Sequence, residues 1–96
     1  MSPKNKKKLN IIRLKLDYLD NKLLSLIKHR TNLVKEVIKL KEFKKEIIDK
    51  KRISIILKNI SNKSKKNNID PKITKRIWIS MIKAFIDYEF RNFKKK

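Results

Sequence analysis

The apolar residues between Leu9 and Leu40 recur at alternating steps of three and four, which is the spacing of one face of an α-helix. This apolar stripe consists of Leu9, Ile12, Leu16, Leu19, Leu23, Leu26, Leu33, Val37 and Leu40, with Arg30 in the place between Leu26 and Leu33. Because neither glycine nor proline occurs between Lys4 and Asp70, we expect a helix from about Lys8 to about Phe43, which is about 50 Å long at the helical rise per residue. A compact chain of 96 residues has a radius of gyration of about 12 Å and cannot cover such a helix. The pattern therefore predicts an intertwined helical homodimer.

Two further helices are expected after the long one. Helical spacing of apolar residues predicts a short helix from about Ile48 to Ile60, with Asp49 near its start. Asp70 followed by Pro71 is typical of a helix N-terminus, and the apolar pattern then continues to Phe93. The segment from Ser61 to Asn68 lacks any apolar residue and is predicted to be a loop.

Composition supports an all-α fold of three helices per chain in one domain, residues 1–96, with a core at about 9–93 and flexible lysine-rich ends. Glycine turns are unavailable to β-hairpins because the chain contains no glycine, and the absence of cysteine excludes disulfides and thiolate metal sites. The sequence has no apolar run of signal-peptide or transmembrane type, so we expect a cytoplasmic protein that does not use a membrane.

A formal charge of +20 raises the alternative of a basic helical dimer that coats nucleic acid. A protein with that function is expected to have lysines clustered on one face and exposed aromatic side chains for base stacking. Charged residues within the apolar stripe would then have no role. The lysines are instead spread over all exposed faces, so no specific nucleic-acid partner is expected.

Three charged residues lie at positions that the apolar pattern reserves for the interior. Arg30 is seven residues from both Leu23 and Val37, and Lys41, eleven residues after Arg30, returns to within about 20° of the same face. Glu89 falls among the apolar residues of the third helix. Arg30 alone could snorkel or pair with a carboxylate. A pure coiled-coil scaffold is a further alternative, but it gives no reason for the three residues to coincide. The three together favour a closed pocket that binds a small dianion.

The same residues carry a resemblance to a known family. The segment IIRLKLDYLDNKLLSLIKHRTNLVKEVIKLK, residues 11–41, resembles the first helix of the all-helical, type II (AroQ-class) chorismate mutases. The similarity rests on Arg13, Leu19-Asp20, Leu23-Leu24, Arg30, Val37 and Lys41, and it continues through Asp49, Arg52, Ile69-Asp70-Pro71 and the segment IDYE, residues 86–89.

This resemblance implies a Claisen rearrangement of chorismate to prephenate, in phenylalanine and tyrosine biosynthesis. Such a pericyclic reaction needs positioning and positive charge, and it needs no covalent intermediate, metal or cofactor. By the resemblance, Arg30 binds one substrate carboxylate, and Lys41 donates to the ether oxygen and a carboxylate. Arg52, with Asp49 nearby, closes the carboxylate and hydroxyl end. Glu89 would donate to the ether oxygen when protonated, so activity should fall as Glu89 loses its proton.

Arg13 would reach the substrate's other carboxylate from the partner subunit. Helix geometry supports this independently, because Arg13 and Arg30 are seventeen residues apart, about 25 Å along one helix and about 100° around it. The expected pocket lining is Val37, Ile53, Ile56, Ile82, Phe85 and Ile86.

Two positions depart from the family pattern. Ile53 replaces a residue that is commonly Glu, and Phe85 replaces one that is often Ser. Both substitutions make the pocket more apolar and resemble the related isochorismate-pyruvate lyases, which form salicylate and pyruvate on the same fold. The lyase activity therefore stands as the alternative within this fold.

Overall fold

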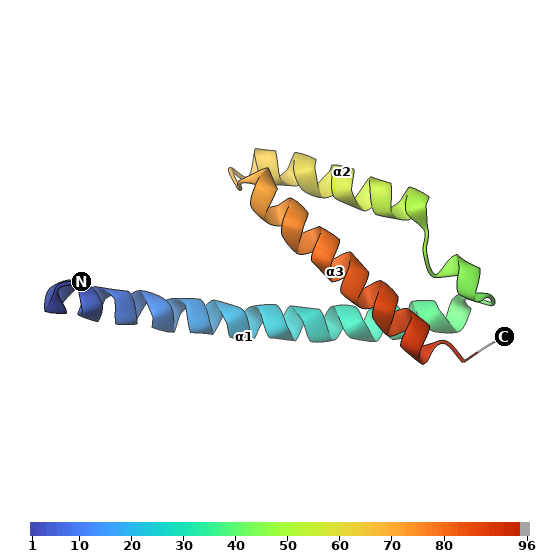
Figure 1. The fold of residues 1–96 in the computed structure, drawn as a ribbon, viewed down its shortest axis with the longest axis horizontal. Coiled ribbons are helices and arrows are strands. Elements are labelled where there is room, and N and C mark those ends of the chain that lie inside the picture. The colour runs from blue at the N-terminus through green and yellow to red at the C-terminus, as the bar shows by residue number, and fades with distance from the viewer. Residues whose placement is uncertain (95–96) are drawn as a thin grey trace. The chain divides into compact units, whose positions relative to one another are not determined.

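In the computed structural model, which describes residues 1–94, the chain is all-helical. It contains α1 (Pro3–Leu40), a short 3-10 turn η1 (Lys44–Glu46), α2 (Lys50–Lys66) and α3 (Pro71–Asn92), with no strand among these residues (Figure 1). The predicted all-α class with three helices is confirmed. The chain divides into two units, residues 1–33 and residues 34–96, of which the second is described to residue 94. The lysines expected to fray at positions 95 and 96 lie outside the described residues.

The first unit consists of the N-terminal part of α1. The helix begins at Pro3, five residues before the predicted start, because Ser2 and Pro3 form a start signal of their own. The Ser2 hydroxyl accepts a hydrogen bond from the Asn5 amide at 3.2 Å, and proline lacks the N–H that the first helical position would leave unpaired. The lysine-rich beginning of the chain is therefore helical.

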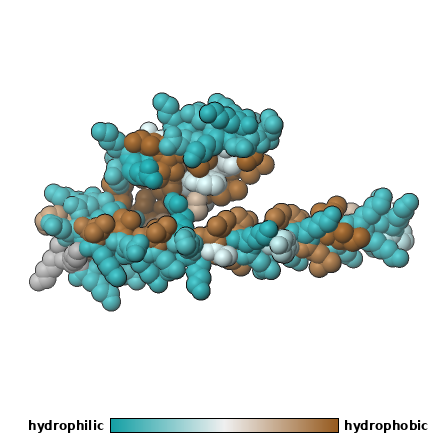
Figure 2. Space-filling model, turned by 180° about the vertical axis from the view of Figure 1, so that it is seen from behind, coloured by the Kyte–Doolittle hydropathy of each residue, from teal (hydrophilic) through white to brown (hydrophobic). Residues whose placement is uncertain are grey.

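The apolar stripe of this unit lies on the surface of the single chain. Leu16, Leu19 and Leu23 are each more than half exposed, and α1 contains no buried residue. Figure 2 shows apolar surface that runs along α1 between hydrophilic patches. The helix thus presents the face that the sequence pattern predicted, without a covering element.

The helix α1 ends at Leu40, three residues before the predicted Phe43. The last bond of its final turn runs from the Lys41 amide to the Ile38 carbonyl at 3.3 Å, and η1 follows. Glu46 in η1 accepts hydrogen bonds from the amides of Glu42 and Phe43, which would otherwise continue the helix. The sequence pattern did not reveal this stop, because it uses neither glycine nor proline.

The prediction of a loop from Ser61 to Asn68 was wrong, since α2 continues to Lys66. Asn68 adopts a left-handed conformation with φ of 55°, which asparagine tolerates better than most residues. The Ile69 amide then bonds to the Ser64 carbonyl at 2.9 Å and the Asn68 amide to the Lys65 carbonyl at 3.3 Å, which is the Schellman pattern. A segment without apolar residues can therefore be helical when a capping motif ends the helix after it and one of its faces packs against another helix.

That packing face involves Ser64, which is buried against α3. Its hydroxyl lies 2.7 Å from the Thr74 hydroxyl and donates to the Ile60 carbonyl at 2.6 Å. Thr74 is also buried, and this hydroxyl pair joins the end of α2 to the start of α3. The two helices form the hairpin seen in Figure 1.

The start of α3 agrees with the sequence prediction. The Asp70 carboxylate accepts a hydrogen bond from the Lys72 amide at 2.9 Å, and Pro71 occupies the first helical position. Between residues 34 and 94 the buried apolar residues are Ile47, Ile82 and Phe93, so this part of the chain has a small core. None of the helices in residues 1–94 combines the length and the apolar content that crossing a bilayer requires.

Candidate active site

The site is centred on an ion pair between α3 and the residue that follows α1. Lys41 Nζ lies 3.0 Å from Glu89 Oε1, and the two side chains are 20% and 10% exposed. Glu89 belongs to the last turn of α3, on the same side as the buried residues Ile82 and Phe93. Two residues that the sequence singled out from segments far apart are therefore brought together.

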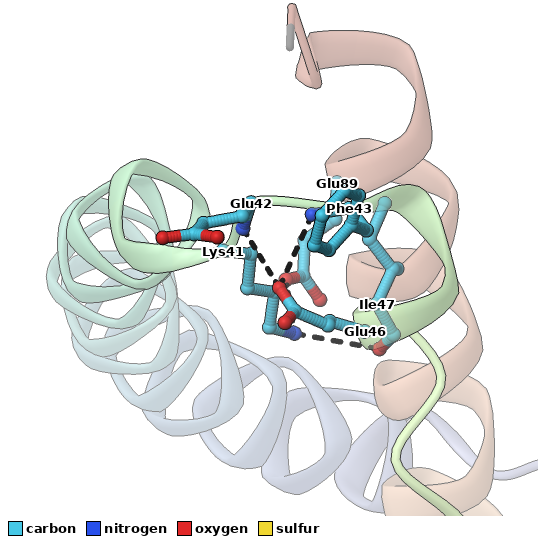
Figure 3. A network of polar contacts seen from close by, with 6 residues as sticks. All are labelled: Lys41, Glu42, Phe43, Glu46, Ile47 and Glu89. Atoms are coloured by element: carbon cyan, nitrogen blue, oxygen red, sulfur yellow. Dashed lines mark hydrogen bonds and ion pairs between the residues drawn. The ribbon is translucent and has the colours of Figure 1, made fainter. Parts of the chain in front are cut away.

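Lys41 has a second acceptor in the connection that follows it. Its ammonium also donates to the Ile47 carbonyl at 3.5 Å, and Ile47 is only 3% exposed. Figure 3 shows the side chains of Lys41 and Glu89 facing one another beside the turn that carries Glu46 and Ile47. A lysine held by two acceptors in a partly desolvated position has less conformational freedom than a surface lysine.

Glu46 is a member of this network that sequence reasoning missed. Its Oε2 accepts from the Glu42 amide at 2.7 Å and from the Phe43 amide at 3.2 Å. These two backbone N–H donors, Phe43 first, hold the pKa of Glu46 below its ordinary value, and the charges of Lys41 and Lys45 act in the same direction. Glu46 was missed because it does not interrupt a helical apolar pattern, since the segment between α1 and α2 is not a continuous helix.

Asp49 and Arg52 meet at the start of α2, but through the backbone. Asp49 is the N-cap of α2, and its carboxylate accepts from the Arg52 amide at 3.0 Å. The Arg52 side chain is exposed and has no hydrogen bond or ion pair within the described part of the chain. Asp49 thus has a capping role, and the binding roles of both residues stay predictions.

The remaining predicted site residues are distributed between the two units. Arg13 is exposed and Arg30 is half-buried, and both belong to residues 1–33. In the second unit Ile82 is buried, the predicted lining residues Ile53, Ile56, Phe85 and Ile86 are half-buried, and Val37 is exposed. The structure brings Lys41 and Glu89 into contact, and the convergence of the other predicted ligands stays a prediction.

A cavity of about 380 Å³ opens within the second unit between the last turns of α1 and α3. It is lined by Lys35, Ile38, Lys39, Tyr88, Asn92, Phe93 and Lys94, and it contains none of the predicted pocket residues. The cavity therefore differs from the predicted substrate pocket, which includes Arg30 and the Arg13 of a second subunit.

The chain places Lys41, after a long first helix, beside Glu89, near the end of the third helix. Known families were compared with this chain. Residues 12–90 match the model of the family described as chorismate mutase type II. The chain belongs to the type II chorismate mutase family. The match includes Arg13, Arg30, Lys41, Arg52 and Glu89, and this family implies a chorismate mutase-type enzyme. Neither the curated proteins nor the solved structures yielded a significant match to the chain.

Proposed function

We propose that the protein is a chorismate mutase that converts chorismate to prephenate in phenylalanine and tyrosine biosynthesis in the cytoplasm. The observation that carries the proposal is the Lys41–Glu89 ion pair, found in a chain of the type II chorismate mutase family. It supplies an ammonium group and a carboxyl group in a place largely shielded from water. The reaction is an isomerisation in which an ether C–O bond breaks and a C–C bond forms, so no other reactant is required.

Lys41 has the principal electrostatic role in this proposal. As the ether bond breaks, negative charge accumulates on its oxygen, and a positioned ammonium stabilises that charge more strongly in a partly desolvated site than in water. Without substrate, Glu89 and the Ile47 carbonyl accept the hydrogen bonds that the ether oxygen and a carboxylate would take over. The ion pair thereby holds the Lys41 ammonium in place for the substrate.

Glu89 has the second role, which depends on its protonation. In the ion pair it accepts a hydrogen bond, and it can donate one to the ether oxygen only as the neutral acid. We therefore propose that Glu89 donates to the ether oxygen as the neutral acid, and that Glu89→Gln, whose amide always donates, keeps turnover. Loss of turnover in a folded Glu89→Gln protein would contradict the donor role of Glu89.

The arginines bind the carboxylates of the substrate in this proposal. We propose that Arg30 binds one substrate carboxylate, that Arg52 closes the opposite end near Asp49, and that Arg13 enters from a partner subunit. The exposed stripe of Leu16, Leu19 and Leu23 supports a homodimer, because burial of this stripe against a second copy would remove a large apolar area from water. In this dimer, residues 9–93 of each chain act as one domain.

The decisive experiment offers the purified protein chorismate and isochorismate separately and identifies prephenate or salicylate. We expect prephenate. Salicylate and pyruvate from isochorismate would establish the lyase alternative, which the apolar Ile53 and the aromatic Phe85 favour. Turnover of neither substrate by an intact folded protein would reject the proposal and return attention to a basic nucleic-acid-binding dimer.

The role of Arg30 is tested by Arg30→Ala. We expect loss of turnover by several orders of magnitude, because a charge-assisted contact to a substrate carboxylate is removed, with helical content and oligomeric state retained. Arg76→Ala is the matched control, since Arg76 is an exposed arginine on α3 outside the proposed site. Unfolding of Arg30→Ala would instead indicate a structural role.

A further inference from the structure

The connection after α1 is organised around one exposed carboxylate. The Glu42 and Phe43 amides directly follow Lys41, and both donate to the same oxygen, Oε2 of Glu46, at 2.7 and 3.2 Å. A carboxylate that accepts two backbone N–H groups restricts the backbone dihedral angles of the residues that carry them. The chain direction immediately after Lys41 is therefore set by the Glu46 side chain.

The same turn brings the second acceptor of Lys41 into place. The Glu46 amide bonds to the Phe43 carbonyl and the Ile47 amide to the Lys44 carbonyl, both at 3.0 Å. This closed turn places the buried Ile47 so that its carbonyl accepts from Lys41 Nζ at 3.5 Å. Figure 3 shows the network, with the Glu46 carboxylate between the two amides and the Lys41 ammonium directed at Glu89 and Ile47.

Neighbouring side chains do not duplicate this function of Glu46. The Glu42 side chain points away from the network in Figure 3, and its carboxylate has no hydrogen bond or ion pair within residues 1–94. Glu42 thus contributes its backbone N–H, whereas Glu46 contributes its side chain. The two glutamates lie four residues apart in the same connection and carry the same charge, so they form a natural matched pair for comparison.

We propose that Glu46 is a positioning residue of the active site, which holds the Lys41 ammonium opposite Glu89 by anchoring the two backbone amides that follow Lys41. This role rests on the proposed function of Lys41 in catalysis. Glu46 itself does not touch the substrate. Its contribution is to reduce the number of orientations that Lys41 adopts, and small displacements of a catalytic group lower the rate steeply.

Steady-state kinetics with chorismate, with helical content and oligomeric state measured alongside, test the proposal in three variants. We expect Glu46→Ala to lower kcat by about tenfold or more with a smaller change in KM, because misplaced charge affects the transition state more than substrate binding. Glu46→Gln should recover most of kcat, since its amide oxygen still accepts from both amides. Glu42→Gln, which removes a charge of the same sign beside Lys41, should match the wild type.

A second measurement does not depend on turnover. NMR of the Lys41 side-chain nitrogen and of the Glu42 and Phe43 amides should show altered shifts and faster hydrogen exchange in Glu46→Ala, and near wild-type behaviour in Glu46→Gln. Unchanged Lys41 signals or unchanged kcat in a folded Glu46→Ala protein would overturn the positioning role. If the wild type turned over no chorismate while the Lys41 signals still moved, the positioning role would stand and the proposed function would fail.

Discussion

At the scale of single residues, the pairing of Lys41 with Glu89 is the feature on which the proposed chemistry depends. Both residues were identified from the sequence because they interrupt apolar patterns, and the structure shows why each is tolerated there. At 3.0 Å each charge neutralises the other in a position largely removed from water. Such a pair adds little net stability compared with apolar residues of similar volume, so stability alone does not explain its presence.

Replacing one residue of the pair, and then both, should show whether Lys41 and Glu89 stabilise the protein through their interaction. We expect Lys41→Met to lower the free energy of unfolding by about 3 kcal/mol, because the Glu89 carboxylate stays buried without its ammonium partner. The double variant Lys41→Met/Glu89→Leu should regain most of this loss, and all of these proteins should lack turnover. Urea denaturation measures the stabilities, and a Lys41→Met protein as stable as the wild type would show that the two groups are not coupled.

Glu46 makes the stability of the same region depend on pH. Hydrogen bonds from the Phe43 and Glu42 amides lower its pKa in the folded chain from the ordinary 4.5, so the unfolded chain binds this proton more readily. The contribution of ionised Glu46 to folding stability is thus complete at pH values above its pKa in the unfolded chain. This contribution is lost as the pH falls through its pKa in the folded chain.

We therefore expect Glu46→Gln to melt at a lower temperature than the wild type at neutral pH, with a gap that narrows as the pH falls below the ordinary carboxyl pKa of 4.5. Thermal melts followed by circular dichroism measure the gap. Glu42→Gln serves as the control, because no backbone amide of residues 1–94 donates to the Glu42 carboxylate. A gap of constant size across this pH range would contradict the assignment.

At the scale of helices, the boundaries depend on side chains that cap and on side chains that pack. Ser2 and Asp70 begin α1 and α3, and both contacts follow from recognised N-cap chemistry. The end of α2 depends on Asn68 in a left-handed conformation and on Ser64 packed against Thr74. The local pattern predicted the Asp70 start of α3, but it placed the start of α1 five residues too late and missed the end of α2. The end of α2 was missed because packing partners ten residues away are not visible in a helical period.

The hydroxyl pair gives the hairpin of α2 and α3 a testable contribution. We expect Ser64→Ala to destabilise the protein by about 1 kcal/mol, since the buried Thr74 hydroxyl loses its nearer partner at 2.7 Å and keeps the Pro71 carbonyl at 3.3 Å. The double variant Ser64→Ala/Thr74→Val removes both polar groups and should recover part of the loss. Denaturant titrations compare the variants, and additive losses in the double variant would exclude a direct interaction.

At the scale of the whole molecule, the exposed stripe on α1 and the two arginines beside it lead to the same proposal. Arg13 and Arg30 lie on one helix at a separation that prevents them from holding one small ligand together. A site completed by a second subunit resolves this difficulty. In the proposed dimer the apolar stripe serves association, and the interruption by Arg30 serves the substrate.

Mixed dimers test the shared site directly. When Arg13→Ala and Arg30→Ala chains, each inactive alone, are unfolded together and refolded, half of the dimers should be mixed. Each mixed dimer then holds one intact site, so we expect about a quarter of the wild-type activity. If Arg13 served the site of its own chain, every site would lack one arginine and the mixture would stay inactive.

The sequence by itself determined the helical class, the long first helix, the N-cap of α3 and the choice of Arg30, Lys41 and Glu89, because each depends on local spacing or on motifs of the family. The tertiary structure decided the contact of Lys41 with Glu89, the true length of α2 and the part played by Glu46. These features depend on where the chain turns after Leu40 and after Lys66. Such turns are set by hydrogen bonds between side chains and backbone groups, which a pattern of apolar residues does not encode.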